Sequence, residues 1–351
     1  MHTERLAPHQ ASREPHQAPV PPAESQARAL LQRLANTWGR RARVKQPELD
    51  GETLFDASTD DFLPALLPFQ DHPAFLAAPD GMRTQILSCG WLAYNEKTVA
   101  IEAKIVAPAC HHIIAGDVPG LHDGVSTQIA SQTLVDEAYH ELLVLHACQV
   151  TRARRGLGAL TLPESQLIVQ MRQAQAQCSA PWQQILVHLA TAIVSEVFIS
   201  DYLHLLSQAM TIQPFNRLTV EAHRHDELAH GSIFKGLARC LYGSLTQHER
   251  AFFIEVLPQP VHWFANSELE VWQAMLQQIG FPATDTVIRD CRRANEANLA
   301  RIDYADLLTL AEELGLFEGQ RGLDSFARAG LVQEGKETNG ATSSGYPTCG
   351  L

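Results

Sequence analysis

The bulk properties of the chain exclude several classes of function. It has 351 residues, 45% of them hydrophobic, and a formal net charge of −12. A chain of this length can bury a large core, and its acidity argues against nucleic acid or an anionic membrane surface as a partner. Seven scattered cysteines form no Cys-x-x-Cys pair, and neither a secretory leader nor a long uncharged apolar stretch is present. We therefore expect a cytoplasmic protein without a membrane span.

Helical periodicity dominates between two polar ends. Residues 1–24 are rich in Pro, Gln and His and predict a disordered tail, and residues 320–351 predict a flexible tail. Between them, residues 25–319 are expected to form a single helical domain. Its first helix is predicted at residues 27–44, where Leu and Trp recur at helical spacing, and the proline-rich residues 46–78 predict a loop.

Four long helices form the predicted core. Each has apolar residues at helical spacing, and glycine or proline follows several of them. They are expected at residues 81–114, 126–155, 182–209 and 215–242. Shorter helices are expected after Pro163 and at residues 247–255, 267–279, 284–300 and 304–314. Because no strand-like alternation appears, the predicted fold class is all-α: a ferritin-like four-helix bundle with additional flanking helices.

Two Glu-x-x-His motifs lie inside the second and fourth of these long helices. The first is Glu137–His140 and the second is Glu227–His230. Residues three apart on a helix differ by about 60° in direction, so each glutamate and histidine can converge on one ion. One such pair has little meaning by itself, but two copies in a four-helix pattern indicate a two-metal carboxylate centre.

The other two long helices each offer one glutamate for the same centre. Glu196 lies in the apolar stretch from Ala192 to Ile199, and Glu102 lies in the apolar stretch from Thr98 to Val106. A carboxylate buried among apolar residues must be paired or bound to a cation. We therefore predict both residues as metal ligands.

The second motif carries one histidine more than the first. His223, Glu227 and His230 stand at i, i+4 and i+7 and so share one stripe of their helix. The predicted set of metal ligands has four carboxylates and three imidazoles: Glu102, Glu137, His140, Glu196, His223, Glu227 and His230. Such a set suits two iron ions, with manganese as the alternative, better than zinc.

An aspartate precedes each motif glutamate. Asp136 and Asp226 point toward a neighbouring helix rather than toward the ligand stripe of their own helix. We predict that each accepts the free imidazole N–H of the other motif's histidine and so fixes that ring's orientation. The alternative is an aspartate that is solvated or merely ion-paired.

The ligand pattern, with the extra His223 before the second motif, resembles the p-aminobenzoate N-oxygenase family of non-haem diiron proteins. The segments Tyr94–Thr98 and Val106–Ala109 resemble the same family, and the resemblance covers roughly residues 60–315. It implies a diiron N-oxygenase that uses dioxygen as co-substrate and an external electron donor. The reaction it implies oxidises a primary amine to a hydroxylamine, nitroso or nitro product in bacterial secondary metabolism.

The resemblance also implies partners. These are a small-molecule amine, either free or bound to a carrier protein, and a reductase or other electron donor, with a homodimer as one expected form. A carboxylate-bearing substrate would need a cation near the metals, and Lys97 and Arg301 are the candidates. Lys97 lies about 140° around its helix from Glu102. Without an evident arginine clamp, an amino-acid-derived amine is an open alternative to an aminobenzoate.

Three other functions compete with N-oxygenation. A diiron carbon hydroxylase or desaturase would share the glutamates and both motifs but has no need of His223. An iron-oxidising or iron-binding ferritin-like protein is a different class, and such chains are usually shorter. A radical-carrying subunit would need a tyrosine beside the metals, for which Tyr202 is a poor candidate.

Overall fold

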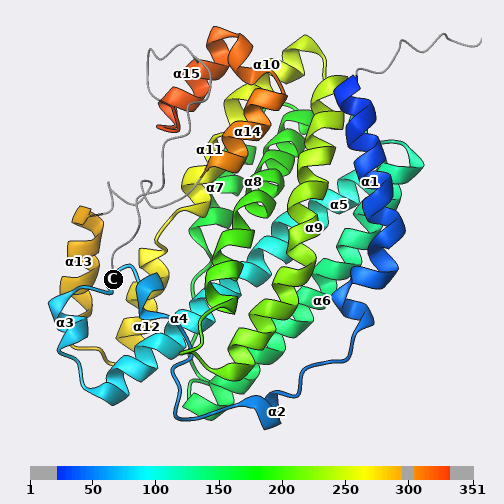
Figure 1. Cartoon of the computed structure of the whole chain (residues 1–351). Coiled ribbons are helices and arrows are strands. Elements are labelled where there is room, and N and C mark those ends of the chain that lie inside the picture. The colour runs from blue at the N-terminus through cyan, green and yellow to red at the C-terminus, as the bar shows by residue number, and fades with distance from the viewer. Residues whose placement is uncertain (1–21, 295–303, 333–351) are drawn as a thin grey trace, which may run out of the picture.

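Helices make up every regular element in the described part of the chain. The computed structural model describes residues 22–294 and 304–332 (Figure 1). Its core contains α4 (Asp80–Ile101), α5 (Ala107–Ala115), α6 (Gly124–Arg155), α8 (Pro181–Ser207) and α9 (Pro214–Ser244). The all-α prediction is confirmed, because these elements form a four-helix bundle in which α4 and α5 act as one long helix.

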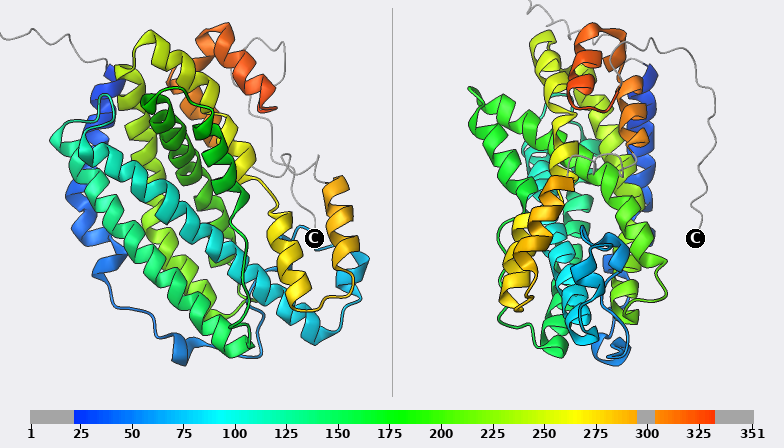
Figure 2. Two further views of the ribbon diagram at one scale, coloured as in Figure 1. Left: turned by 180° about the vertical axis from the view of Figure 1, so that it is seen from behind. Right: turned by 90° about the vertical axis from the view of Figure 1, so that its left-hand side faces the viewer.

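The bundle is built from two helix pairs. Helix α8 packs along α9, α4 and α5 pack along α6, and α6 also packs against α9 (Figures 1 and 2). Helix α8 is the innermost, and every residue from Leu186 to Ile199 is buried. Polar side chains in that run must therefore find partners inside the bundle.

Shorter helices flank the bundle on two sides. Helix α1 (Pro22–Arg41) lies across α6 and α9, at the right of Figure 1. On the left of that view, α12 (Leu269–Gln278) packs against α4, and α13 (Thr284–Ala294) packs against α12. The remaining flanking elements are η1 (Arg43–Lys45), α2 (Gly51–Leu54), η2 (Pro64–Leu66), α3 (Pro73–Leu76), α7 (Gln166–Ala176), α10 (Gln247–Val256), α11 (Gln259–Phe264), α14 (Ala305–Glu313), η5 (Leu316–Glu318) and α15 (Gln320–Arg328).

The first long helix is not regular throughout. Residues Glu102–Val106 form a π-helical turn between α4 and α5, in which the N–H of Ala107 donates to the carbonyl of Glu102, five residues earlier. Pro108 follows directly and cannot donate a backbone hydrogen bond, which favours a local change of helical pitch. Such π turns are frequent at functional sites, and this one begins at a predicted metal ligand.

The structure departs from the prediction at both margins of the domain. The segment 46–78, predicted as loop, contains α2, η2 and α3. The flexible tail predicted from residue 320 is wrong for residues 320–332, since α15 packs against α10 and Phe326 is fully buried. Residues 1–21, 295–303 and 333–351 lie outside the described residues, so the rest of the tail predictions and part of the predicted helix 284–300 are not addressed.

Two helical segments are long and apolar enough to cross a membrane by composition alone. They are Asp80–Ala115 and Pro181–Ser207. Burial inside the protein covers 50% and 88% of their most apolar windows, respectively. Both are core elements of the bundle, so packing against neighbouring helices accounts for their composition.

Candidate metal centre and adjoining cavity

The seven predicted metal ligands come together in the middle of the bundle. Helix α6 supplies Glu137 and His140, α8 supplies Glu196, and the π turn after α4 supplies Glu102, while α9 supplies the remaining three. All seven are at most 2% exposed. Because α6, α8 and α9 are straight through this region, the ligand spacing along each sequence becomes a stripe that faces the bundle axis.

Most of the ligand atoms form two overlapping groups. In one group the ligand atoms of Glu137, His140, Glu227 and His230 lie within 4.8 Å of one another, and in the other those of Glu102, His140 and His223 do. Nδ1 of His230 lies 3.1 Å from Oε1 of both Glu137 and Glu227. The two groups share His140 and so lie side by side, which fits two neighbouring ions.

The remaining carboxylate, Glu196, lies at the edge of this cluster, and Glu102 is joined to it through His223. Oε2 of Glu196 lies 3.8 Å from Nδ1 of His230, and Oε1 of Glu102 lies 3.1 Å from Nε2 of His223. Nε2 of His223 also lies 3.2 Å from Oε1 of Glu227. The extra histidine of α9 therefore connects the glutamate of the π turn to the second motif.

The donor set fits a pair of metal cations. Oε2 of Glu196 and Oε2 of Glu227 are buried and meet no hydrogen-bond donor within residues 22–294 and 304–332. Buried carboxylate oxygens without donors are costly unless a cation neutralises them. Carboxylates together with imidazoles are the ligands preferred by iron and manganese.

The electrostatics of the cluster show the same need for positive charge. Burial raises the pKa of Glu102 to about 7, and burial together with the nearby Glu227 and Glu137 raises the pKa of Glu196 well above its ordinary value. Burial also pushes up the pKa of Glu227, but His230 and His140 outweigh it and hold that pKa well below the usual range. Bound metal cations would supply the positive charge that these buried carboxylates need.

Asp136 and Asp226 lie behind the two motif histidines in a crossed arrangement. Nε2 of His230 lies 3.3 Å from Oδ2 of Asp136, and Nε2 of His140 lies 3.3 Å from Oδ2 of Asp226. Each aspartate therefore contacts the histidine of the other motif. Such a contact fixes which imidazole nitrogen faces the cluster.

A further layer around these aspartates was not foreseen from the sequence. The indole Nε1 of Trp38 donates to Oδ1 of Asp136 over 2.8 Å, and the backbone N–H of Arg43 donates to both carboxylate oxygens of Asp226. The Arg41 guanidinium lies between the two, with Nη1 3.8 Å from Asp136 and 3.9 Å from Asp226. The sequence offered only the helical spacing of Trp38 as a signal, since nothing local links residues 38–43 to residues 136 and 226.

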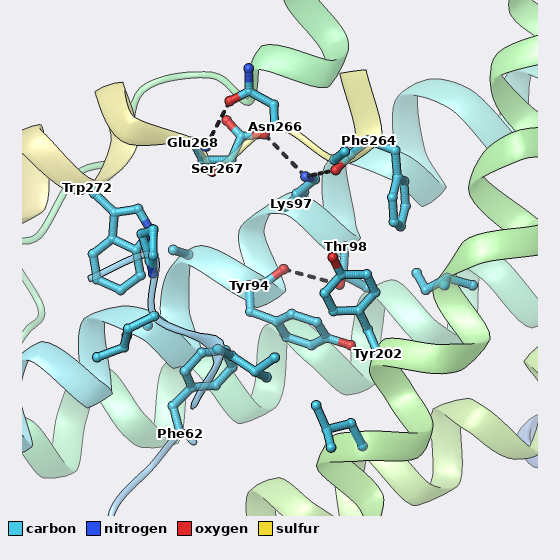
Figure 3. Close-up of a pocket in the computed structure, with 18 of the residues that line it drawn as sticks. Phe62, Tyr94, Lys97, Thr98, Tyr202, Phe264, Asn266, Ser267, Glu268 and Trp272 are labelled. Carbon is cyan, nitrogen blue, oxygen red and sulfur yellow. Dashed lines mark hydrogen bonds and ion pairs between the residues drawn. The ribbon is translucent and has the colours of Figure 1, made fainter. Parts of the chain in front are cut away.

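A cavity of about 510 Å³ is lined by residues of α4, of α8 and of the connection between α11 and α12 (Figure 3). One face of α4 lines it with residues at helical spacing, ending at Ile101, immediately before Glu102. Phe198 and Ile199 of α8, which follow Glu196, form another wall. The rest of the lining is rich in aromatic rings, namely Phe62, Tyr94, Tyr202, Phe264 and Trp272.

Lys97, one of the two predicted substrate contacts, lies in the wall of this cavity. Its Nζ donates to the carbonyl of Phe264 over 2.8 Å and lies 3.4 Å from Oε1 of Glu268 (Figure 3). Burial lowers the pKa of Lys97, and Glu268 opposes that shift. The lysine is therefore already paired. The other candidate, Arg301, lies outside the described residues.

Glu268 is itself held firmly. Its backbone is in the left-handed region at φ 52°, which is uncommon for a residue other than glycine. Its carboxylate accepts hydrogen bonds from the Ser165 hydroxyl at 2.6 Å and from the Gln166 N–H at 2.9 Å. Strained conformations of this kind cluster at ligand sites, and the sequence carried no signal for this residue.

Comparison with known proteins agrees with this geometry. Residues 24–315 match the model of the p-aminobenzoate N-oxygenase AurF family. Among curated proteins, the chain is similar to a 4-aminobenzoate N-oxygenase of Streptomyces thioluteus, with 31% identity over 293 residues. That alignment covers 82% of this chain and 87% of the relative.

Proposed function

The chain belongs to the p-aminobenzoate N-oxygenase AurF family and is an N-oxygenase, and we propose that its substrate is an aromatic primary amine bound in the cavity beside the carboxylate–histidine cluster. The observation that carries this proposal is the position of the cavity, whose walls on α4 and α8 lead directly to Glu102 and Glu196. A volume of about 510 Å³ lies within the range of roughly 300–1,000 Å³ typical of small-molecule sites.

We propose two iron ions as the metals and the seven predicted residues as their ligands, with manganese as the alternative. Bound iron would supply the binding and reductive activation of dioxygen. The chain's own side chains orient the site: Asp136 and Asp226 fix the rings of His230 and His140. Aromatic side chains line much of the cavity beside these residues.

The reaction needs electrons from outside the protein. Conversion of an amine to a hydroxylamine follows RNH2 + O2 + 2e⁻ + 2H⁺ → RNHOH + H2O. The amine loses two electrons and dioxygen gains four, so an external donor supplies the difference. We propose that this donor is a separate reductase or electron carrier.

The cavity favours an aromatic substrate whose amine points toward the cluster. The rings of Tyr94, Phe264 and Trp272 can stack on an aryl group. At the far end, Lys97 and Glu268 offer a donor and an acceptor that are already paired with each other. A neutral hydrogen-bonding group on the substrate suits such a pair better than a free carboxylate does.

The competing functions fit these features less well. A carbon hydroxylase or desaturase shares the glutamates but leaves His223, 3.1 Å from Glu102, without a purpose. An iron-storage protein has no use for an aromatic cavity leading to its metal ligands. We infer a cytoplasmic enzyme from its free cysteines. A homodimer and a carrier-bound form of the amine are further proposals.

One experiment separates these readings. The iron-loaded protein is reduced without oxygen, exposed to dioxygen, and given 4-aminobenzamide, 4-aminobenzoate or, as an aliphatic control, cyclohexylamine. We expect hydroxylamine, nitroso or nitro products, detected by mass spectrometry, from the aromatic amines. Oxygen from ¹⁸O2 should appear on nitrogen. Products oxidised only at carbon, or oxygen consumption that no amine changes, would contradict the proposal.

A further inference from the structure

We propose that the face formed by α1 and η1 is the docking site of an acidic one-electron carrier protein, and that Trp38 and Asp136 form the route from this face to the metal centre. The inference goes beyond the proposed substrate, although it rests on the proposed metal centre. The centre is fully buried, so electrons from a separate protein need a path through the bundle wall.

A continuous chain of hydrogen bonds crosses this wall. Trp38 is partly exposed on α1, and its Nε1 donates to Oδ1 of Asp136 at 2.8 Å. Oδ2 of the same carboxylate lies 3.3 Å from Nε2 of His230. Nδ1 of that imidazole lies 3.1 Å from both Glu137 and Glu227. The path from a surface indole to a ligand atom thus passes through two side chains only.

The second aspartate does not continue to the surface in the same way. Asp226 also contacts a motif histidine, but its further partners are the backbone N–H of Arg43 and the Arg41 guanidinium. Neither the backbone N–H nor the guanidinium is oxidised as readily as an indole ring. The asymmetry singles out Trp38, among the described residues, as the aromatic group attached to the cluster from outside.

The surface around Trp38 has the charge that an acidic partner requires. Residues 25–47 contain six cationic residues and no acidic one, although the whole chain has a net charge of −12. Two of the six face carboxylates of this chain, Arg28 with Glu24 and Arg41 with Asp136, so the surface charge comes from the other four. Arg33, Arg40 and Lys45 are exposed. Nζ of Lys45 lies 4.9 Å from the centre of the Trp38 ring. A local cationic patch on an acidic protein steers an anionic partner to one place, because the rest of the surface repels it.

The electron balance of the proposed step is simple. The carrier is a reduced iron–sulfur protein of the acidic ferredoxin class. It gives up one electron per encounter and is oxidised, the metal centre is reduced, and no covalent bond forms or breaks. Two encounters supply the electrons for one hydroxylation of the amine. The protons are consumed where water is formed and do not pass along this route.

The test follows electron transfer without amine or oxygen. Reduced plant-type ferredoxin is mixed with the oxidised, iron-loaded protein, and oxidation of ferredoxin is followed by its visible band. We expect Arg40→Glu with Lys45→Glu to lower the second-order rate constant at low salt by about tenfold or more. High salt should shrink this difference. Arg292→Glu with Arg293→Glu, at two exposed positions of α13 on the opposite side of the molecule (Figures 1 and 2), is the matched double control.

Trp38→Phe and Trp38→Gln test the route itself, and glutamine keeps a donor for Asp136. We expect both to slow electron transfer severalfold at saturating ferredoxin, while iron content and the number of electrons accepted from dithionite stay unchanged. Trp182→Phe is the control. Wild-type electron-transfer rates in both Trp38 variants would overturn the proposal. So would a second-order rate constant in the Arg40→Glu/Lys45→Glu protein equal to that of the α13 control. A wild-type protein that accepts no electrons even from dithionite would overturn the metal centre as well.

Discussion

The two sides of the metal cluster are built from different side chains. Toward α1 the cluster is backed by charged and hydrogen-bonded groups, in which Trp38 and Arg41 contact Asp136 and Arg41 also approaches Asp226. Toward α4 and α8 it borders a cavity with mostly aromatic walls. The difference follows from ligand type: a buried imidazole has a second N–H that must be satisfied, whereas a carboxylate ligand has none. His140 of α6 and His230 of α9 therefore need outer partners, whereas the helices that supply only Glu102 or Glu196 are free to border a cavity.

Removal of Glu227 should disrupt the whole metal cluster, and with it both iron binding and activity. Glu227 contacts His140, His223 and His230. Loss of an outer partner alone typically costs 10–100-fold in metal affinity, so we expect Glu227→Ala to lower iron affinity by more than about 100-fold. Iron content after gel filtration and N-oxygenation activity measure the effect. Glu221→Ala, at an exposed position of the same helix, should retain both, and iron retention in Glu227→Ala would contradict the assignment.

The charged side should depend on Arg41 for its stability. All three guanidinium nitrogens of Arg41 are buried between Asp136 and Asp226. Removing one partner of a buried ionic group typically costs 3–5 kcal/mol. We expect Arg41→Met to lower the free energy of unfolding of the metal-free protein by about that amount, as measured in urea. Arg40→Met, at an exposed neighbour, should change it little. Equal urea unfolding midpoints for Arg41→Met and Arg40→Met would show that Asp136 and Asp226 are stable in the core without the Arg41 guanidinium.

The crossed aspartates should matter for metal binding more than for folding. In Asp136→Asn and Asp226→Asn the side chain keeps its size but loses the charge that orients His230 or His140. We expect iron affinity to fall by roughly 10–100-fold in each, as measured by competition with a chelator. Asp285→Asn, at an exposed position of α13, serves as the control. Unchanged affinity in both buried variants would mean that the bundle alone orients the rings.

The cavity side should control substrate choice through Glu268. Because Glu268 lies 3.4 Å from Lys97, it neutralises the cation that a substrate carboxylate would seek. We expect Glu268→Gln to improve KM for 4-aminobenzoate relative to 4-aminobenzamide by about tenfold, or about 1.4 kcal/mol. Glu270→Gln, an exposed neighbour on α12, provides the comparison. If the ratio of KM for 4-aminobenzoate to KM for 4-aminobenzamide stays at the wild-type value, the carboxylate or amide group of the substrate does not lie beside Glu268.

The smallest expected effect is at the start of α6. Asp123 caps this helix by accepting from the N–H groups of Val125 and Ser126, and it pairs with Arg28 of α1. Burial raises the pKa of Asp123, but the hydrogen bonds from Ser126 and the charge of Arg28 together outweigh burial and lower that pKa below 3.8. The stabilisation is therefore present above the unfolded pKa and is lost as pH falls through the folded one. Asp123→Ala should cost about 1 kcal/mol at neutral pH. The difference in free energy of unfolding between Asp123→Ala and wild type should become smaller as pH drops below 3.8. A difference in urea midpoint that stays the same across this pH range would contradict the prediction.

The predicted helices and the observed ones agree best where the pattern is longest. Residues 126–155 were predicted as one helix, and α6 spans Gly124–Arg155. Agreement fails where the chain departs from regular geometry, as at the π turn after Ile101 and in the short helices of segment 46–78. The tail prediction failed at residues 320–332 because α15 gains its stability from packing against α10, which no local pattern records.

The sequence by itself determined the spacing of the cluster. Helical geometry fixes how Glu137 relates to His140 and how His223 relates to Glu227, so the ligand stripes follow from residue numbers. Tertiary structure alone decided what surrounds those stripes. It brought Trp38 to Asp136 across 98 positions and Glu268 to Lys97 from the connection between α11 and α12. The reason is physical: spacing within a helix is local geometry, whereas contact between distant segments depends on how whole helices pack.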